Sequence, residues 1–239
     1  MKQYNRVIQV MKENGGYATL GFLNQHVDVA EWITKTPYAS IRRIVQDDRF
    51  FFKIRPGLWA LNEYKKDILD RFEISDNTKS IENEKFSHTY FQGLIVEIGK
   101  LKGFETYIPT QDRNKLFLTK TLSEIADSTV IYDFTYPEIV SRAKTIDVIW
   151  FHENRLPHTF IEVEHTTDFQ NSLLKFVDLQ YFYSDFIIAG SNDRKREFES
   201  KININVFRAI RSRVKFIDYD NIARTHANLM EKQSLMSIW

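Results

Sequence analysis

The chain has 239 residues, of which 43% are hydrophobic and 27% charged, and its formal net charge at pH 7 is +1. This composition is that of a folded globular protein and excludes an intrinsically disordered chain. The sequence contains no cysteine, which excludes a disulfide framework and a thiolate zinc site. No stretch approaches the roughly 20 apolar residues of a membrane span, and the first residues lack the apolar core of a signal peptide. We therefore expect a cytoplasmic protein with no membrane partner.

The beginning of the chain carries the pattern of three helices followed by a β-hairpin. Residues 4–14 place apolar side chains at helical spacing before a glycine pair, and a second helix is expected at 18–25. A third helix, amphipathic and basic, is expected after Thr36, which would cap it, with a proline at the first helical position. The following segment, FFFKIRPGLWAL, predicts two strands around a turn.

This order of elements resembles the winged helix-turn-helix family over about residues 1–63. The resemblance implies that the third helix enters the major groove of double-stranded DNA and that the hairpin touches the DNA backbone. The DNA contacts that it implies are Tyr38, Ser40, Arg42 and Arg43 on the third helix, and Lys53 and Arg55 on the hairpin. The alternative is that these side chains form a solvated face of a domain that binds protein.

A charged segment that is poor in aromatic and β-branched residues marks a domain boundary. We predict a winged-helix domain at 1–75, a linker at 76–85 and a second domain at 86–239. In the second domain the sequence HTYFQGLIVEIGKLKG predicts an amphipathic helix, and ETYIP, TIDVIWF, HTFIEVEH, DFIIAG and VKFID predict strands. Residues 111–143 are expected to be an irregular insertion. The expected fold class is mixed α/β, with a mixed sheet flanked by helices.

Three carboxylates fall on two consecutive predicted strands. Asp147 belongs to TIDVIWF, and Glu162 and Glu164 belong to HTFIEVEH. Side chains alternate along a strand, so Glu162 and Glu164 share one face while the residues between them pack the other. Two acids on one face of an otherwise buried strand repel each other unless a cation lies between them. Because Mg²⁺ prefers oxygen ligands and assists phosphodiester hydrolysis, the pattern indicates a Mg²⁺ site in which Mn²⁺ would substitute.

Over about residues 86–218 the sequence resembles the PD-(D/E)XK nuclease superfamily. The match consists of Asp147, fourteen intervening residues and Glu162-Val163-Glu164, within the superfamily's order of helices and strands. The resemblance implies metal-dependent hydrolysis of DNA, with Asp147 and Glu162 binding the metal and Glu164 orienting or activating water. The sequence departs from the superfamily pattern at Glu164, where lysine is usual. Lys144 or Lys175 could replace that lysine in space.

Residues around the motif extend the predicted site. In this superfamily the first helix often delivers another acid to the metal, which makes Glu97 a candidate ligand. The alternative for Glu97 is the charged edge of an amphipathic helix. Downstream, the resemblance places Thr166, Thr167 and Lys175 near the scissile phosphate, with Lys175 as a catalytic residue. The threonines are also explained as helix caps.

Together, the two resemblances imply a sequence-specific Type II restriction endonuclease that acts on duplex DNA, where a homodimer would cut both strands together. Two alternatives stay open. A modification-dependent or repair nuclease would share the catalytic core, and a winged-helix regulator with a degenerate nuclease fold would bind DNA without cutting it. The sequence has no glycine-rich phosphate loop, no G-x-S-x-G motif and no cysteine nucleophile, which argues against ATP-driven translocation and two common hydrolase mechanisms.

Overall fold

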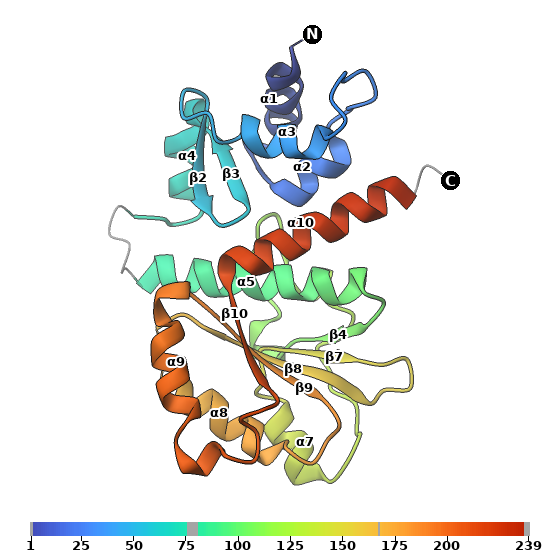
Figure 1. Cartoon of the computed structure of the whole chain (residues 1–239), viewed down its shortest axis with the longest axis vertical. Coiled ribbons are helices and arrows are strands. Elements are labelled where there is room, and N and C mark those ends of the chain that lie inside the picture. Colours follow the sequence, from blue (N-terminus) through green and yellow to red (C-terminus); the bar gives the residue numbers. More distant parts are fainter. Residues whose placement is uncertain (1, 76–80, 167, 237–239) are drawn as a thin grey trace. The chain divides into compact units, whose positions relative to one another are not determined.

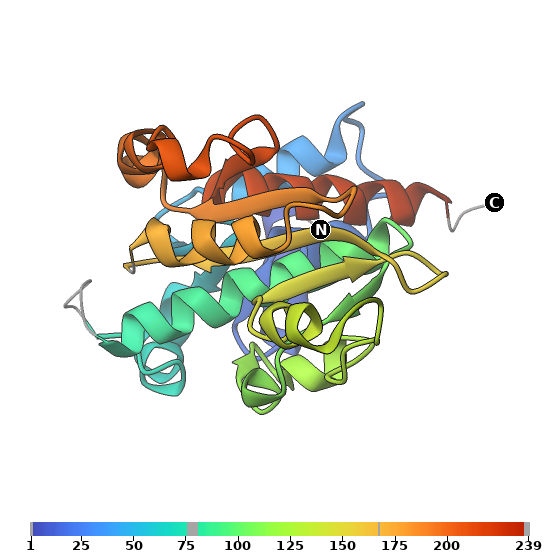
Figure 2. The same cartoon turned by 90° about the horizontal axis from the view of Figure 1, so that it is seen from below.

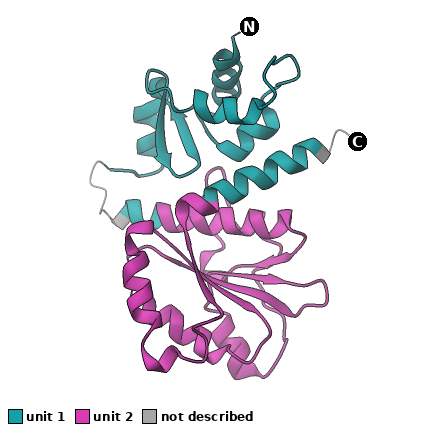
Figure 3. Cartoon of the chain, in the orientation of Figure 1, with its two compact units in different colours: residues 1–86, 223–239 teal, residues 87–222 magenta. Residues whose placement is uncertain are grey.

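The computed structural model describes residues 2–75, 81–166 and 168–236. The chain forms two compact units, which are described separately: unit 1 contains residues 1–86 and 223–239, and unit 2 contains residues 87–222 (Figure 3). Unit 1 therefore includes the C-terminal segment, whereas the second domain was predicted to run to the end of the chain. No helix within the described residues is long and apolar enough to cross a membrane.

Unit 1 consists of short helices packed against a three-stranded antiparallel sheet (Figure 1). The strand order is β1-β3-β2, and β2 and β3 form the expected hairpin. Val7, Leu23 and Ile41, one from each of the first three helices, are fully buried in its core. Its complete elements are α1 (Gln3–Glu13), β1 (Tyr17–Thr19), α2 (Leu20–His26), α3 (Pro37–Ile44), β2 (Phe51–Arg55), β3 (Leu58–Leu61), η1 (Asn62–Tyr64) and α4 (Lys65–Arg71).

The first helix ends at the glycine pair, as the sequence predicted. Gly15 and Gly16 both have positive φ, at 79° and 90°. The N–H of Gly16 donates to the carbonyl of Met11 at 2.7 Å, which closes the helix end. A Cβ on Gly16 would lie 2.5 Å from the ring of Tyr64. Both the backbone conformation and the close ring therefore require glycine at this turn.

The end of the last helix, α10 (Tyr219–Met236), completes the core of unit 1. Ala227 is buried in the same cluster as the first three helices. The side-chain amide of Asn24 donates to the carbonyl of Ala227 at 3.4 Å. A Cβ on Gly21 would lie 2.7 Å from the imidazole of His226, so glycine allows α2 to approach α10 closely. These contacts explain why the C-terminal segment groups with unit 1.

Unit 2 is a five-stranded mixed sheet with helices on both faces, which confirms the predicted mixed α/β class (Figures 1 and 2). The strand order is β10-β9-β8-β7-β4, with parallel pairing among β8, β9 and β10 and antiparallel pairing to β7 and β4. The long helix α5 (Ile81–Leu101) lies on one face, and α7 and α8 lie on the other. The other elements are β4 (Glu105–Tyr107), η2 (Thr110–Asp112), β5 (Leu116–Phe117), β6 (Lys120–Thr121), α6 (Leu122–Ile125), α7 (Pro137–Ala143), β7 (Val148–Phe151), β8 (Pro157–Glu164), α8 (Phe169–Asp178), β9 (Asp185–Gly190), η3 (Asn192–Arg194), α9 (Lys195–Ile202), η4 (Asn205–Phe207) and β10 (Val214–Asp218).

The alternation of side chains along β7 and β8 decides which helix each residue meets. Trp150 of β7 faces α5, where its indole N–H donates to the carbonyl of Ile95 at 3.2 Å. Phe160 of β8 faces the opposite layer and is fully buried in the core that includes α7 and α8. Glu162 and Glu164 share the face of Phe160, because side chains two residues apart point the same way. Both carboxylates therefore point toward α8.

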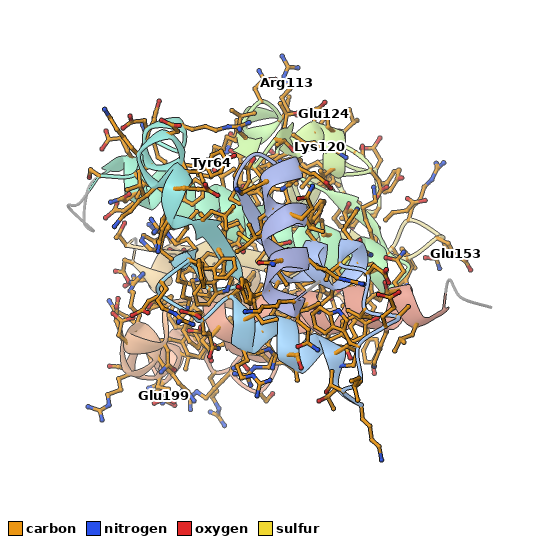
Figure 4. All side chains as sticks on the ribbon, turned by 90° about the horizontal axis from the view of Figure 1, so that it is seen from above. Tyr64, Arg113, Lys120, Glu124, Glu153 and Glu199 are labelled. Atoms are coloured by element: carbon orange, nitrogen blue, oxygen red, sulfur yellow. The ribbon has the colours of Figure 1, made fainter. Side chains whose placement is uncertain are left out.

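The insertion at 111–143 contains more regular structure than the sequence analysis expected. Strands β5 and β6 form a small antiparallel hairpin, and α6 and α7 follow it. The helix α6 begins with a capping box. The backbone N–H of Thr121 donates to the carboxylate of Glu124 at 2.6 Å, and the Thr121 side chain accepts from the backbone N–H of Glu124. That T-x-x-E pattern is a signal for a helix start that was overlooked. Arg113 of the same insertion is exposed and points away from the ribbon in Figure 4.

Candidate active site

Asp147 lies in the connection between α7 and β7, one residue before the strand in which it was expected. Its Oδ2 atom accepts a hydrogen bond from the backbone N–H of Val163 at 2.8 Å and lies 3.3 Å from Nε2 of His88. Its backbone carbonyl accepts from the amide of Gln92 at 2.8 Å. Within the described residues no protein group pairs with Oδ1, and the side chain is 17% exposed. Oδ2 of Asp147 is therefore held by protein groups, whereas Oδ1 has no protein partner among the described residues.

The surroundings of Asp147 favour its ionised form. Burial alone would raise the pKa of this carboxyl group, but the hydrogen bond and charge of His88 and the N–H of Val163 oppose that effect. The net result is a pKa below the usual value for aspartate. Asp147 is thus a negatively charged carboxylate at neutral pH, able to serve as an oxygen ligand.

Glu162 and Glu164 lie at the end of β8 and are almost completely buried, at 3% and 4% exposure. Oγ of Ser172, on α8, is 3.0 Å from Oε2 of Glu162 and also contacts Oε1 of Glu164. This shared contact confirms that the two side chains lie on one face of the strand. A hydroxyl group has one hydrogen to donate, so both contacts can be hydrogen bonds only if one carboxyl group holds a proton.

Glu162 is the carboxyl group whose surroundings favour that proton. Burial and the negative charge of Asp147 raise the pKa of Glu162 to about 8, and Lys175 opposes the rise without cancelling it. Without a bound cation, Glu162 is therefore mainly protonated at neutral pH. A positive charge placed near these oxygens would favour release of the proton.

Lys175 supplies a positive charge to the site from α8. Its Nζ atom is 2.8 Å and 3.0 Å from the two carboxylate oxygens of Glu162, and it donates to the carbonyl of Thr145 at 2.8 Å. Lys175 and Ser172 are three residues apart and project from one face of the helix. Lys144, the other lysine considered as a replacement for the motif lysine, is exposed and has no contact with the carboxylates in the described structure. The structure therefore brings Lys175 to the site and not Lys144.

The structure does not bring Glu97 to these carboxylates. The residues of α5 that reach Asp147 are His88 and Gln92. Glu97 follows His88 by nine residues, which at about 100° per residue places it on the opposite side of the helix. Among the described residues, no group of three or more His, Cys, Asp or Glu side chains is arranged to hold a metal ion. The ligand set of Asp147, Glu162 and Glu97 is thus not formed.

The predicted DNA contacts on α3 divide into exposed and buried residues. Arg42 and Arg43 are exposed, and Tyr38 is half-buried against the core of unit 1. Ser40 is only 6% exposed, and its hydroxyl donates to the carbonyl of Thr36 at 3.3 Å. Thr36 begins the helix as expected but makes no side-chain capping bond. The prediction that Ser40 contacts DNA is wrong, because Ser40 lies on the face of the helix that packs into the core.

The hairpin offers one of its two predicted contacts to solvent. Lys53 is exposed on β2. Arg55 is half-buried, and its guanidinium donates to the carbonyls of Ile54 and Asn83, at 2.8 Å and 3.3 Å. The same group lies 5.4 Å from the centre of the Phe86 ring. Arg55 therefore joins the hairpin to the segment that follows it within unit 1, which opposes its predicted role on the DNA backbone.

The residues that follow β8 were predicted to approach the scissile phosphate. Thr166 is exposed directly after the strand, and Thr167 lies outside the described residues. The side chain that caps α8 belongs to Asp168, which accepts from the N–H of Gln170 at 3.0 Å. The capping role considered for the threonines therefore falls to this aspartate.

Sequence reasoning missed Ser172 and the roles of His88 and Gln92. Ser172 contacts both glutamates, and its position three residues before Lys175 was the available signal. His88 and Gln92 are four residues apart, which places both on one face of α5. Their spacing was visible in the sequence, but their target, Asp147, is not local to them.

Comparison with protein-family models assigns the chain to the restriction enzymes. More particularly, residues 71–239 match the model described as the Type II restriction enzyme NmeDI C-terminal domain, and the chain belongs to this family. The matched range covers more than half of the chain and includes every residue of the acidic site. Membership makes the protein a restriction endonuclease, whose substrate is DNA. Comparisons with curated proteins and with solved structures gave no match.

Proposed function

We propose that the protein is a sequence-specific Type II restriction endonuclease that uses a PD-(D/E)XK-type site and Mg²⁺ to hydrolyse duplex DNA. One observation carries the proposal, which is the cluster around two buried carboxyl groups. Glu162 and Glu164 both contact the hydroxyl of Ser172, Lys175 contacts Glu162, and the charge of Asp147 raises the pKa of Glu162. A fold gains no stability from two carboxylates on a buried strand face, so their arrangement is best explained by chemistry.

The donor set fits a hard divalent cation. Mg²⁺ usually binds one or two protein carboxylates and completes its coordination with water and substrate phosphate, so a preformed cage of three acids is not required. Oδ1 of Asp147 faces no protein partner in the described structure. Oxygens of Glu162 accept two bonds from Lys175 and contact Oγ of Ser172, which leaves at least about one of its four acceptor positions. We propose that Asp147 and Glu162 hold Mg²⁺, with Mn²⁺ able to substitute.

A cation at this position would neutralise charge on the scissile phosphate and lower the pKa of an attacking water. Lys175 supplies the positive charge that the motif normally carries at position 164, and its two bonds to Glu162 fix the orientation of that carboxylate. Glu164 is the proposed acceptor of the proton that the water loses, because its Oε1 atom is held by Ser172 in the same acidic group.

Unit 1 is proposed to be a winged-helix reader of DNA sequence. Its three helices and its hairpin follow the order of that family, and Arg42, Arg43 and Lys53 present exposed positive charge. Such charges provide sequence-independent attraction to phosphates, whereas base contacts provide specificity. The described part of each chain contains one such acidic site, so we propose that two copies act together to cut both strands.

The test is incubation of the purified full chain with methylated and unmethylated DNAs, in Mg²⁺ or in EDTA, followed by gel analysis. Discrete, Mg²⁺-dependent fragments are expected, and Asp147→Asn should abolish them. Asp133→Asn, which alters an exposed aspartate, is the matched control and should cut normally. DNA that stays intact in every lane, although a protein complex forms at low salt, would overturn the proposal and favour a DNA-binding regulator. Cleavage of methylated DNA alone would favour a modification-dependent nuclease.

A further inference from the structure

A buried polar network joins the insertion to the backbone of Asp147. Gln92 of α5 is fully buried, and its Nε2 atom donates to Oδ2 of Asp112 at 2.9 Å and to the carbonyl of Asp147 at 2.8 Å. Asp112 is 3% exposed, and its other oxygen pairs with Nζ of Lys115 at 2.6 Å. The network therefore runs from the surface of the insertion through α5 to the acidic site.

The amide of Gln92 has only one orientation that satisfies both neighbours. A carboxylate and a carbonyl are both acceptors, so the nitrogen, with its two hydrogens, must face them. The oxygen of the amide is then buried without a partner in the described structure. An unpaired buried oxygen lowers the stability of the fold, so the contribution of Gln92 comes from the two hydrogen bonds that its nitrogen donates.

The connection that carries Asp147 is held along its length by side chains from other elements. Tyr107 of β4 donates to the carbonyl of Lys144 at 3.1 Å, and Lys175 of α8 donates to that of Thr145 at 2.8 Å. Gln92 completes the series at Asp147 itself. These three bonds and the Val163 N–H add to the turn bonds of the connection itself, from the N–H groups of Thr145 and Ile146, and to the burial of the Ile146 side chain.

A second contact seats the insertion on the same part of α5. Phe117 of the β5–β6 hairpin packs so closely on Gly93 that a Cβ there would lie 2.2 Å from its ring. The Phe117 ring also stacks near Tyr90, with 6.0 Å between ring centres. The insertion therefore contacts two successive residues of α5, an amide through Asp112 and a glycine through Phe117.

We propose that the first part of the insertion, residues 111–125, is a positioning element for the active site, in which Asp112 orients Gln92 and Gln92 fixes Asp147. Gln92 and Asp112 act through Asp147 and do not touch the substrate. With its backbone carbonyl fixed and Oδ2 held by Val163, Asp147 presents Oδ1 in one direction. This inference rests on the proposed role of Asp147 in binding the cation.

The test replaces Gln92 by methionine, which keeps the length and volume of the side chain but removes both hydrogen bonds. Partners that orient a metal-binding residue typically contribute 10- to 100-fold to metal affinity or activity. Gln92→Met is therefore expected to weaken Mn²⁺ binding, measured by calorimetry without DNA, about 10-fold or more. Single-turnover cleavage should fall by a similar factor, while DNA affinity in EDTA stays unchanged. Asp112→Asn retains an acceptor for Gln92 and should cause a smaller loss in the same direction.

Asp127→Asn is the matched control. Asp127 also ties the insertion to the rest of unit 2, through Thr106 at 2.8 Å and Lys100 at 3.2 Å, but it makes no bond to Asp147. It should lower the urea midpoint of unfolding and leave Mn²⁺ affinity unchanged. Wild-type Mn²⁺ affinity and cleavage in both Gln92→Met and Asp112→Asn would overturn the inference, as would an equal loss in Asp127→Asn. If Asp147→Asn itself cleaved DNA normally, the proposed function would fail first.

Discussion

The pH dependence of folding provides a direct measure of the conflict inside the acidic site. Burial and Asp147 raise the pKa of Glu162 from its ordinary value of 4.5 to about 8. Between these pH values the folded protein holds a proton that the unfolded chain has released. Stability that is present below the unfolded pKa is therefore lost as pH rises toward the folded one. At 1.36 kcal/mol per pH unit, the full loss is about 5 kcal/mol.

Glu162→Gln keeps the shape of the side chain and removes its charge. Between about pH 5 and pH 8 in EDTA, the stability of this variant relative to the wild type is expected to rise by several kcal/mol. Urea unfolding at several pH values measures the difference, and Glu153→Gln, on the exposed β7–β8 turn, shows what loss of a surface carboxylate does. Cleavage by Glu162→Gln should fall at least about 100-fold. A stability difference that stays constant with pH would refute the reasoning.

Three further predictions concern other parts of the chain. Lys175→Met should lower single-turnover cleavage about 100- to 1,000-fold, whereas Lys144→Met should cut at the wild-type rate; similar rates for both variants would contradict the assignment. Burial, followed by repulsion from His152, lowers the pKa of His158. The stability that His158 contributes above about pH 6.5 is therefore lost at lower pH. In urea unfolding at about pH 5, His158→Gln should lose less stability than the wild type. Joint replacement of Arg42 and Arg43 by alanine should weaken DNA binding in EDTA and reduce the salt slope by about two, and an unchanged slope would show that α3 makes no phosphate contacts.

The acidic face could be predicted because it follows from geometry that is local to one strand. Glu162 and Glu164 are two residues apart, and any extended strand turns such side chains to one side. The pairing of β7 with β8 then brings Asp147 to Val163. Since consecutive strands joined by a short turn usually pair, this step also needed little beyond the sequence.

The contributions of the helices could not be predicted in the same way. Whether His88 or Glu97 of α5 reaches the sheet depends on how the helix is rotated about its axis. That rotation is fixed by distant contacts, such as the close approach of Gly99 to Trp150, where a Cβ would lie 2.5 Å from the indole nitrogen. The choice of Lys175 over Lys144 has the same origin, because it depends on the packing of α8 against the sheet.

Two predicted DNA contacts failed for a related reason. Basic and polar residues on a short helix or hairpin are expected to face solvent, yet a three-helix core needs one face of α3 for packing. Ser40 lies on that inner face, and Ile41 beside it is fully buried. Arg55 is long enough to turn back to carbonyls within unit 1, and the local sequence does not predict that orientation.

Glu162 and Glu164 occupy positions at which the fold alone would favour apolar side chains. Their neighbours Ile161 and Val163 are at most 3% exposed. Glu162 and Glu164 themselves lie on the same face of β8 as Phe160, which belongs to the main core of unit 2. Ser172 and Lys175 satisfy part of the hydrogen-bonding capacity, but the raised pKa of Glu162 shows that desolvation and repulsion still exceed that compensation. Conflicts of this kind are expected where function, and not stability, determines the residue. If the single change Glu162→Gln raises stability and also abolishes cleavage, the carboxylate of Glu162 is therefore catalytic and not structural.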